Sequence, residues 1–397
     1  MSARIAVPTA VTALPRRQAL SFLSLFFVPS VAQATLLTVV PLEALELLGT
    51  ARRVTLLYVA AGLVTVAGRF TIPLLVRLIR RRFVFTLGTI CLASAGALLA
   101  VNKIPTLAAG LVLSTFGFAC IEITSQLYLL DHVSRYALKR FEPLRIFIIA
   151  GPWTLGPWLG VYLQQSVSFA APFAIVSTTA CVLLGLFWHL RMGENAVLAA
   201  MRRPPPSLTR YLPHFFAQKR LRLAWTLASA RSSWWSLFYV YAPIFAVTSG
   251  LGAGTGGIVV SVGSGWIWLV PVWGWIGRRY GLRHLLLAGY ALAGLLSLCT
   301  AQAFGVPWLC VVMMLAAALA TETIDGAGNL LFLRAVHPYE RAEMTTVFVS
   351  FRDVAQLGPP AVCSVLLSLF SLSSVFVAGG VMMLASAVLC RHIPRRL

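Results

Sequence analysis

Twelve apolar runs, most of them about as long as a lipid bilayer is thick, constrain this chain more than any other feature of its sequence. A helix that crosses the hydrocarbon core needs about 20 predominantly apolar residues. Because a bilayer offers no water to the backbone, each run is expected to satisfy its own hydrogen bonds as an α-helix. The sequence therefore predicts an all-α membrane protein with twelve transmembrane helices. The runs cover residues 19–41, 54–76, 83–101, 104–130, 144–164, 169–190, 223–247, 256–277, 285–303, 306–333, 345–370 and 375–390.

The composition excludes a soluble domain. Of the 397 residues, 59% are hydrophobic and only 11% are charged, whereas a soluble domain carries about 25% charged residues. A net charge of +21 could indicate nucleic-acid binding. However, the basic residues fall in short clusters between apolar runs and not on one face of a domain, which argues against it. The expected partner is the lipid bilayer, with no nucleic acid.

A basic segment divides the runs into two groups of six. Residues 191–222 contain the sequence RRPPPS, and consecutive prolines prevent a continuous helix there. The sequence predicts an N-terminal bundle over residues 1–190, a cytoplasmic linker over 191–222 and a C-terminal bundle over 223–397.

The basic residues predict the orientation in the membrane. Of the 32 Lys and Arg residues, all but six lie at the chain ends or in every second loop, which are on one side. Basic loops stay in the cytoplasm, so both termini are expected to be cytoplasmic and the protein to lie in the cytoplasmic (inner) membrane. The six exceptions are Arg52, Arg53 and Lys103 in loops of the other side and Arg69, Arg231 and Arg352 within runs.

The two halves repeat one pattern of polar residues. In each half an acid inside an apolar run is followed four residues later by an amide, then by a basic segment and a Gly-Pro pair. A chain that repeats itself at half its length, with acids in its apolar helices, is typical of transporters. The repeated residues are Glu122 with Gln126 and Asp325 with Asn329, then Gly156-Pro157 and Gly358-Pro359.

One loop carries a family motif. Residues 274–283 read GWIGRRYGLR, which resembles the loop signature G-x-x-x-D-R-x-G-R-R of the major facilitator superfamily. Residues 72–81, IPLLVRLIRR, align with it at an offset of 202 and keep three arginines without the glycines or the acid. Small residues allow a tight helix–helix turn, and arginines there bind helix carbonyl ends or carboxylates to hold one conformation closed. The matching residues are Gly274, Arg279, Gly281 and Arg283 in one copy and Arg77, Arg80 and Arg81 in the other.

The fifth run adds a second resemblance. Its sequence GPWTLGPWLG is similar to the Gly-Pro-rich motif of drug/proton antiporters in the same superfamily, with matches at Gly156, Pro157 and Gly160. The alternative is a packing kink that says nothing of direction. The resemblance implies two six-helix bundles around a central cavity, working as a monomer with protons as coupling ion.

Seven charged residues lie deep in the apolar runs, where a charge costs about 2.5–3.5 kcal/mol. We expect Glu122, Glu322 and Asp325 to carry protons, since Glu322 and Asp325 share a helix face and two close carboxylates do not both ionise easily. The alternative is that these acids are permanently paired with arginines and only fix the packing. Full pairing leaves one acid over: the acids are Glu122, Glu322, Asp325 and Asp353, and the bases are Arg69, Arg231 and Arg352.

Arg231 is predicted to contact the substrate. Aromatic residues follow it at helical spacing, and an arginine beside aromatic rings suits an anionic or aromatic ligand. The alternative is that Arg231 bonds to an acid of the tenth or eleventh helix. The predicted substrate-binding residues are Arg231, Trp234, Trp235, Phe238, Gln126, Asn329 and Arg352.

No metal site, cofactor motif, ATP-binding loop or catalytic set of residues is found in the sequence, so the protein is not expected to be an enzyme. These observations predict a secondary transporter that exports a small organic molecule, such as a drug-like compound or a secreted metabolite of the siderophore kind, in exchange for protons. Two alternatives remain open: a proton-coupled uptake symporter for a metabolite or organic anion, and a polytopic sensor or assembly protein that transports nothing.

Overall fold

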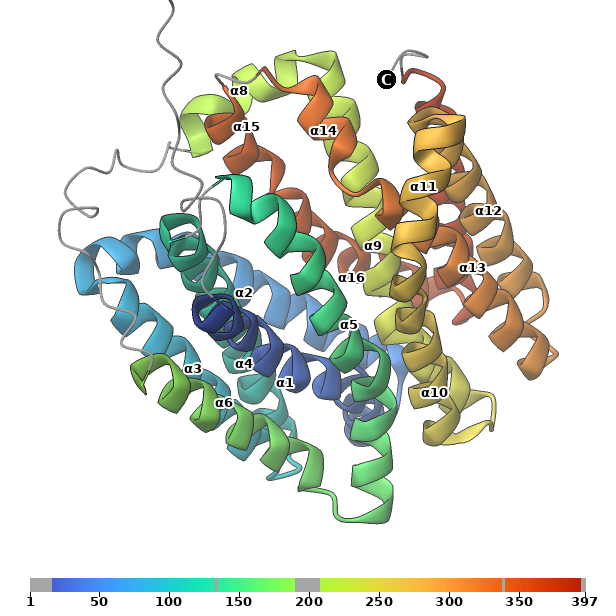
Figure 1. The fold of residues 1–397 in the computed structure, drawn as a ribbon. Helices are drawn as coiled ribbons and strands as arrows, with labels where there is room; N and C mark the ends of the chain where they lie inside the picture. The colour runs from blue at the N-terminus through green and yellow to red at the C-terminus, as the bar shows by residue number, and fades with distance from the viewer. Residues whose placement is uncertain (1–15, 133–134, 190–207, 338–339, 394–397) are drawn as a thin grey trace, which may run out of the picture.

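The computed structural model describes residues 16–132, 135–189, 208–337 and 340–393, and all of their regular structure is helical (Figure 1). We call the side at which the first helix begins and the last helix ends the terminal side, and the other side the opposite side. Successive long helices run between the two sides. The all-α fold class expected from the apolar runs is thereby confirmed.

Six helices form the first half. The α3 helix packs against α4 and α6, while α1 packs against α5 and α6. One large apolar cluster includes residues from all six. The helices are α1 (Arg16–Leu48), α2 (Ala51–Ile79), α3 (Arg81–Leu99), α4 (Ile104–His132), α5 (Arg135–Ser166) and α6 (Ala171–His189).

The second half is more broken than the uniform apolar runs predicted. Its second long segment is divided into α10, a 3₁₀ turn and α11, and its fourth into α13 and α14. The elements are α8 (Leu208–Ala217), α9 (Lys219–Thr248), α10 (Gly252–Gly265), η2 (Trp266–Leu269), α11 (Val270–Tyr280), α12 (Leu282–Gln302), α13 (Pro307–Ala327), α14 (Leu330–Ala335), α15 (Arg341–Phe348), α16 (Phe351–Leu369) and α17 (Ser373–Cys390).

Ten helical segments in the described residues are long and apolar enough to cross a membrane. The α9 and α16 helices complete the set of twelve expected spans. The α9 helix carries Arg231, and α16 carries Arg352 and Asp353.

The predicted linker is described only in part. Residues 190–207, including the proline run, lie outside the described residues. The rest of it forms the short helix α8 and the start of α9, which begins at Lys219. His214 Nε2 of α8 lies 3.2 Å from Glu340 Oε1, and this contact attaches α8 to the start of α15. The division of the chain into domains at residues 190 and 223 stays a prediction.

The first helix is longer than predicted. The apolar run predicts a helix that ends at residue 41, but α1 continues through Pro41 to Leu48. Proline is tolerated within membrane helices because neighbouring groups satisfy the backbone. The extension brings two acids, Glu43 and Glu46, into α1.

The two loop motifs adopt the same turn with different residues. Gly281 ends α11 and begins α12 with φ +93° and ψ 143°, while Arg80 ends α2 and begins α3 with φ +64° and ψ 152°. The structural counterpart of Gly281 is therefore Arg80 and not Ile79, so the offset of 202 is wrong by one residue at the turn. Only glycine adopts this conformation without strain.

Contacts between the halves join α2 to α16, α5 to α10 and α1 to α9. Toward the opposite side they are close and hydrogen-bonded. Thr55 Oγ1 lies 2.7 Å from Tyr241 Oη, and the Trp158 backbone N–H donates to Ser261 Oγ at 2.8 Å. A Cβ atom on Gly257 of α10 would lie 3.2 Å from Trp158 Cα. The halves are thus tightly closed against each other toward the opposite side.

Candidate functional site

Arg231, Trp235 and Asp325 form a polar cluster inside the second half. Arg231 Nη1 lies 3.1 Å from Asp325 Oδ1, and Trp235 Nε1 donates to Asp325 Oδ2 at 2.8 Å. Arg231 and Trp235 are four residues apart on α9, so one face of that helix holds both oxygens of the carboxylate. The Arg231 side chain is 11% exposed and that of Asp325 is 28% exposed. The pair is thus largely removed from solvent, where a charge-assisted contact is strong.

Glu322 adds a second acid to this cluster. It lies one helical turn before Asp325 on α13 and is 4% exposed. Arg231 is bound to Asp325, and Glu322 has no ion pair with an arginine among the described residues. The cluster therefore combines an ion pair with a buried acid that no arginine neutralises.

The chain breaks directly after the cluster. The α13 helix ends at Ala327, Gly328 takes φ +51°, and α14 begins at Leu330. Broken membrane helices place free backbone groups beside binding sites near the middle of the bilayer. Asn329, a predicted substrate-binding residue, lies in this break with its side chain exposed.

The other two predicted aromatic residues, Trp234 and Phe238, contact the cluster through edge-to-face packing on the Trp235 ring. Trp234 stacks on Phe238 with ring centroids 5.4 Å apart, and its Nε1 donates to Ser297 of α12 at 3.0 Å. Both rings are buried and line a small hollow within the second half. Trp235 instead stacks on Tyr239 at 5.3 Å. Among the three predicted rings, the structure brings Trp235 to the partner of Arg231, and the binding roles of Trp234 and Phe238 stay predictions.

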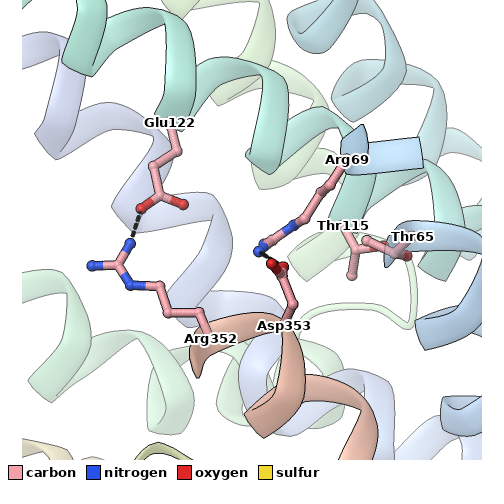
Figure 2. A network of polar contacts seen from close by, with 6 residues as sticks. All are labelled: Thr65, Arg69, Thr115, Glu122, Arg352 and Asp353. Carbon is pink, nitrogen blue, oxygen red and sulfur yellow. Dashed lines mark hydrogen bonds and ion pairs between the residues drawn. The ribbon is translucent and has the colours of Figure 1, made fainter. Parts of the chain in front are cut away.

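Two ion pairs cross from one half to the other, near the terminal side (Figure 2). Arg352 Nη1 of α16 lies 2.6 Å from Glu122 Oε1 of α4. Asp353 Oδ1, next in sequence, lies 3.0 Å from Arg69 Nη1 of α2. Adjacent residues of one helix thus hold two different helices of the first half.

The Glu122–Arg352 pair is more exposed than the Arg231–Asp325 pair. The side chains of Glu122 and Arg352 are 43% and 45% exposed. Gln126, one turn after Glu122 on α4, is also exposed. The α2 and α4 helices are tied to each other by Thr65 Oγ1 and Thr115 Oγ1 at 2.7 Å (Figure 2). Glu122 and Arg69 therefore sit on a connected pair of helices that α16 contacts as a unit.

In the described residues, each of the three intramembrane arginines is paired with one acid. Of the four acids predicted within the apolar runs, Glu322 is the one without an arginine partner there. Arg231 bonds to Asp325 in the tenth predicted helix, as one of the two sequence-based interpretations expected. Glu122 is likewise paired with Arg352. Whether these residues carry protons or substrate stays a prediction.

The glycines of the fifth-helix motif pack within the first half. A Cβ atom on Gly156 would lie 2.5 Å from Ala34 Cβ, and one on Gly160 would lie 2.6 Å from the Thr35 carbonyl oxygen. Both glycines allow α5 to approach α1 closely. Pro157 is on the other face, where its carbonyl oxygen would be 3.3 Å from a Cβ on Gly257 of α10.

Sequence reasoning missed Glu43, whose side chain is 1% exposed. It was missed because the first helix was ended at the proline two residues earlier. The apolar residues that continue to Leu48 were the signal that the helix did not stop there.

No family model matches this chain, and no curated protein matches it. Solved structures do match along nearly the whole length. A peptide transporter, POT, in complex with sulfate has a TM-score of 0.75 at 13% identity, covering 98% of this chain and 97% of that one. A D-xylose–proton symporter has a TM-score of 0.72 at 12% identity, covering 96% and 99%. The nucleoside transporter NupG has a TM-score of 0.70 at 13% identity, covering 94% and 98%.

The chain has the major facilitator fold. This likeness extends over both halves and all the expected spans, and it agrees with the resemblance carried by the loop motif around Gly281. At these identities the likeness speaks to the fold alone.

Proposed function

We propose that this protein is a proton-coupled secondary transporter of a small organic molecule. The observation that carries the proposal is the cluster of Arg231, Asp325 and Glu322, in which a buried surplus acid lies beside an ion pair at a broken helix. A proton is the simplest ligand for such an acid, and its arrival or departure changes what Arg231 binds.

In the proposed cycle, Glu322 and Asp325 compete for Arg231. With a proton on Glu322, Arg231 stays on Asp325, as in this structure. Loss of that proton creates a second carboxylate that draws Arg231 away, and Asp325 is then held only by Trp235. The break at Gly328 lets α14 move relative to α13 as the contacts change. Proton binding is thereby coupled to the shape of the second half.

The ion pairs across the halves would act as conformational contacts. Rocking of one bundle against the other changes the distances within Glu122–Arg352 and Arg69–Asp353, because each pair has one member in each half. Glu122 and Arg352, which are nearly half exposed, would meet a polar substrate together with Gln126 and Asn329. We place Arg352 and Arg231 among the groups that would meet an anionic part of it.

We further propose export, in a cytoplasmic membrane with both termini in the cytoplasm and with the monomer as the working unit. The resemblance of the Gly-Pro-rich motif in α5 to that of drug/proton antiporters supports this direction, whereas the close α1–α5 contact at Gly156 and Gly160 fits export and simple packing equally. Uptake is the second candidate, and the D-xylose–proton symporter among the matching structures favours it.

The test is proton movement in proteoliposomes when candidate substrates are added under an imposed pH gradient. Substrate-induced proton flux is expected. Flux of protons opposite to the substrate supports export, and flux in the same direction supports uptake. Silence over a broad panel of peptides, sugars, nucleosides and amphiphilic drugs, with folded and inserted protein, counts against proton coupling.

A further inference from the structure

Glu43 of α1 is a buried acid that takes no part in the proposed transport cycle. Its side chain is 1% exposed, and neither carboxylate oxygen has a hydrogen-bond partner among the described residues. Glu46, one turn further along the same helix, is exposed. The two acids thus have the same chemistry and opposite environments, three residues apart.

The residues that flank Glu43 on α1 are apolar. Leu42 and Leu45 belong to an apolar cluster that also includes Tyr241 and Ile244 of α9 and Val375 of α17, so this end of α1 packs with both halves. Glu46, one helical turn away, has the same sign of charge and cannot act as a counter-ion for Glu43.

Among the described residues, the helices packed against α1 bring no buried base to this region. Arg52 and Arg53 at the start of α2 and Lys103 before α4 are exposed. The other titratable groups toward this side are hydroxyls and thiols, and the described residues of α10 contribute none. They are Tyr58 of α2, Tyr162 of α5, Cys181 of α6, Tyr239 and Tyr241 of α9, and Cys363 of α16, which interacts with Tyr241.

We propose that Glu43 is a second proton-binding site, separate from Glu322 and sealed by the closure of the two halves toward the opposite side. A buried carboxylate without a partner costs several kcal/mol, whereas a protonated carboxyl group costs much less. Glu43 therefore holds a proton while the halves are closed. The proposal rests on the bundles rocking, as in the proposed transport function.

In the proposed cycle, opening toward the opposite side separates the residues of α9 and α17 from the end of α1 that carries Glu43. Thr55 and Tyr241, which are hydrogen-bonded across the halves at 2.7 Å, belong to the contacts that must part. Water then reaches Glu43, which exchanges its proton with that side of the membrane. Closure in turn selects the protonated form, so proton binding at Glu43 favours the conformation seen here.

Infrared difference spectroscopy of the full-length protein in lipid tests this site directly. The carbonyl stretch of a protonated carboxyl group is separate from the bands of a carboxylate. At neutral pH we expect one such band that is lost in Glu43→Gln and kept in the matched control Glu46→Gln and in Glu322→Gln. Glu43→Asp is expected to move the band without abolishing it, which covers the case in which the Gln variant does not fold.

The seal is tested by hydrogen–deuterium exchange of the same band. Gly257→Leu forces a side chain against Trp158 and separates α5 from α10, and Gly257→Ala does so more mildly. Exchange at Glu43 is expected to become about tenfold faster in these variants, since exchange of a sealed group requires opening.

Two results would overturn the proposal. One is the absence of a band that depends on Glu43, which would mean that the acid is ionised. The other is an exchange rate that does not respond to the Gly257 variants. Neither result bears on Glu322, so failure here is distinguishable from failure of the proposed coupling.

Discussion

Glu122 and Asp325 occupy the same place in the two repeats, yet the structure connects them differently. Glu122 bonds across the halves to Arg352, with both side chains nearly half exposed. Asp325 bonds within its own half to Arg231 and Trp235, beside the buried Glu322. A pair that spans the halves must break when they move apart, and a pair inside one half need not. We therefore propose conformational control for the first and proton coupling for the second.

The largest difference is expected when one acid of each kind is removed. Asp325→Ala leaves Arg231 without its partner in a mostly buried site, and should lower the free energy of unfolding by about 3–5 kcal/mol. Glu122→Ala removes a solvated pair and should cost about 0–1 kcal/mol. Thermal unfolding of the purified protein in detergent measures both. Equal losses would remove the distinction between the two acids.

A second contrast concerns glycines within and between the halves. Gly160→Ala places a Cβ atom 2.6 Å from the Thr35 carbonyl oxygen inside the first half, and should cost about 1–3 kcal/mol of stability. Gly257→Ala places a Cβ atom 3.2 Å from Trp158 Cα in the other half, and the two halves can move apart to relieve this contact. It should change stability less and increase labelling of a cysteine introduced at Tyr241. A larger stability loss for Gly257→Ala than for Gly160→Ala would contradict this account.

Glu43 is a third kind of acid, buried and unpaired. Glu43→Met replaces it with an apolar side chain of similar length, and should raise the free energy of unfolding by about 1–3 kcal/mol, because an unbonded polar group leaves the core. Glu46→Met, at an exposed position, is the control and should change little. A loss of stability in Glu43→Met would indicate a polar partner for Glu43.

The smallest change in the free energy of unfolding is expected at the α2–α3 turn and the α11–α12 turn. Arg80→Gly should stabilise the protein by about 1 kcal/mol, because Arg80 holds a backbone conformation that only glycine adopts without strain. Gly281→Ala should destabilise it by a similar amount, because the same turn gains a side chain. The pair of unfolding temperatures checks both signs. No gain from Arg80→Gly would show that the arginine side chain offsets the strain.

The sequence is sufficient to predict the helices but not the contacts between their side chains. The length of an apolar run predicts a span because the bilayer requires helices. The residues within the runs also show three intramembrane bases and four acids. The prediction missed Glu43, since a proline does not end a membrane helix as it ends a soluble one.

Pairing could not be predicted in the same way. Arg352 and Asp353 are neighbours in sequence, and nothing along the chain indicates that one reaches α4 and the other α2. The break at Gly328 was missed as well, although residues 326–329 read GAGN and contain turn-forming residues. The apolar residues from Leu330 onward continue the run and conceal the interruption. Contacts between segments depend on how helices are oriented around their axes, which composition does not record.

The most direct test is substrate-induced proton flux in proteoliposomes containing Glu322→Gln or Glu122→Gln, side by side. Glutamine keeps the shape and removes the proton site. We predict that Glu322→Gln abolishes the flux while retaining exchange of substrate for substrate, and that Glu122→Gln keeps a proton flux. The reverse result, with flux lost only in Glu122→Gln, would place coupling at the contact between the halves and contradict the account.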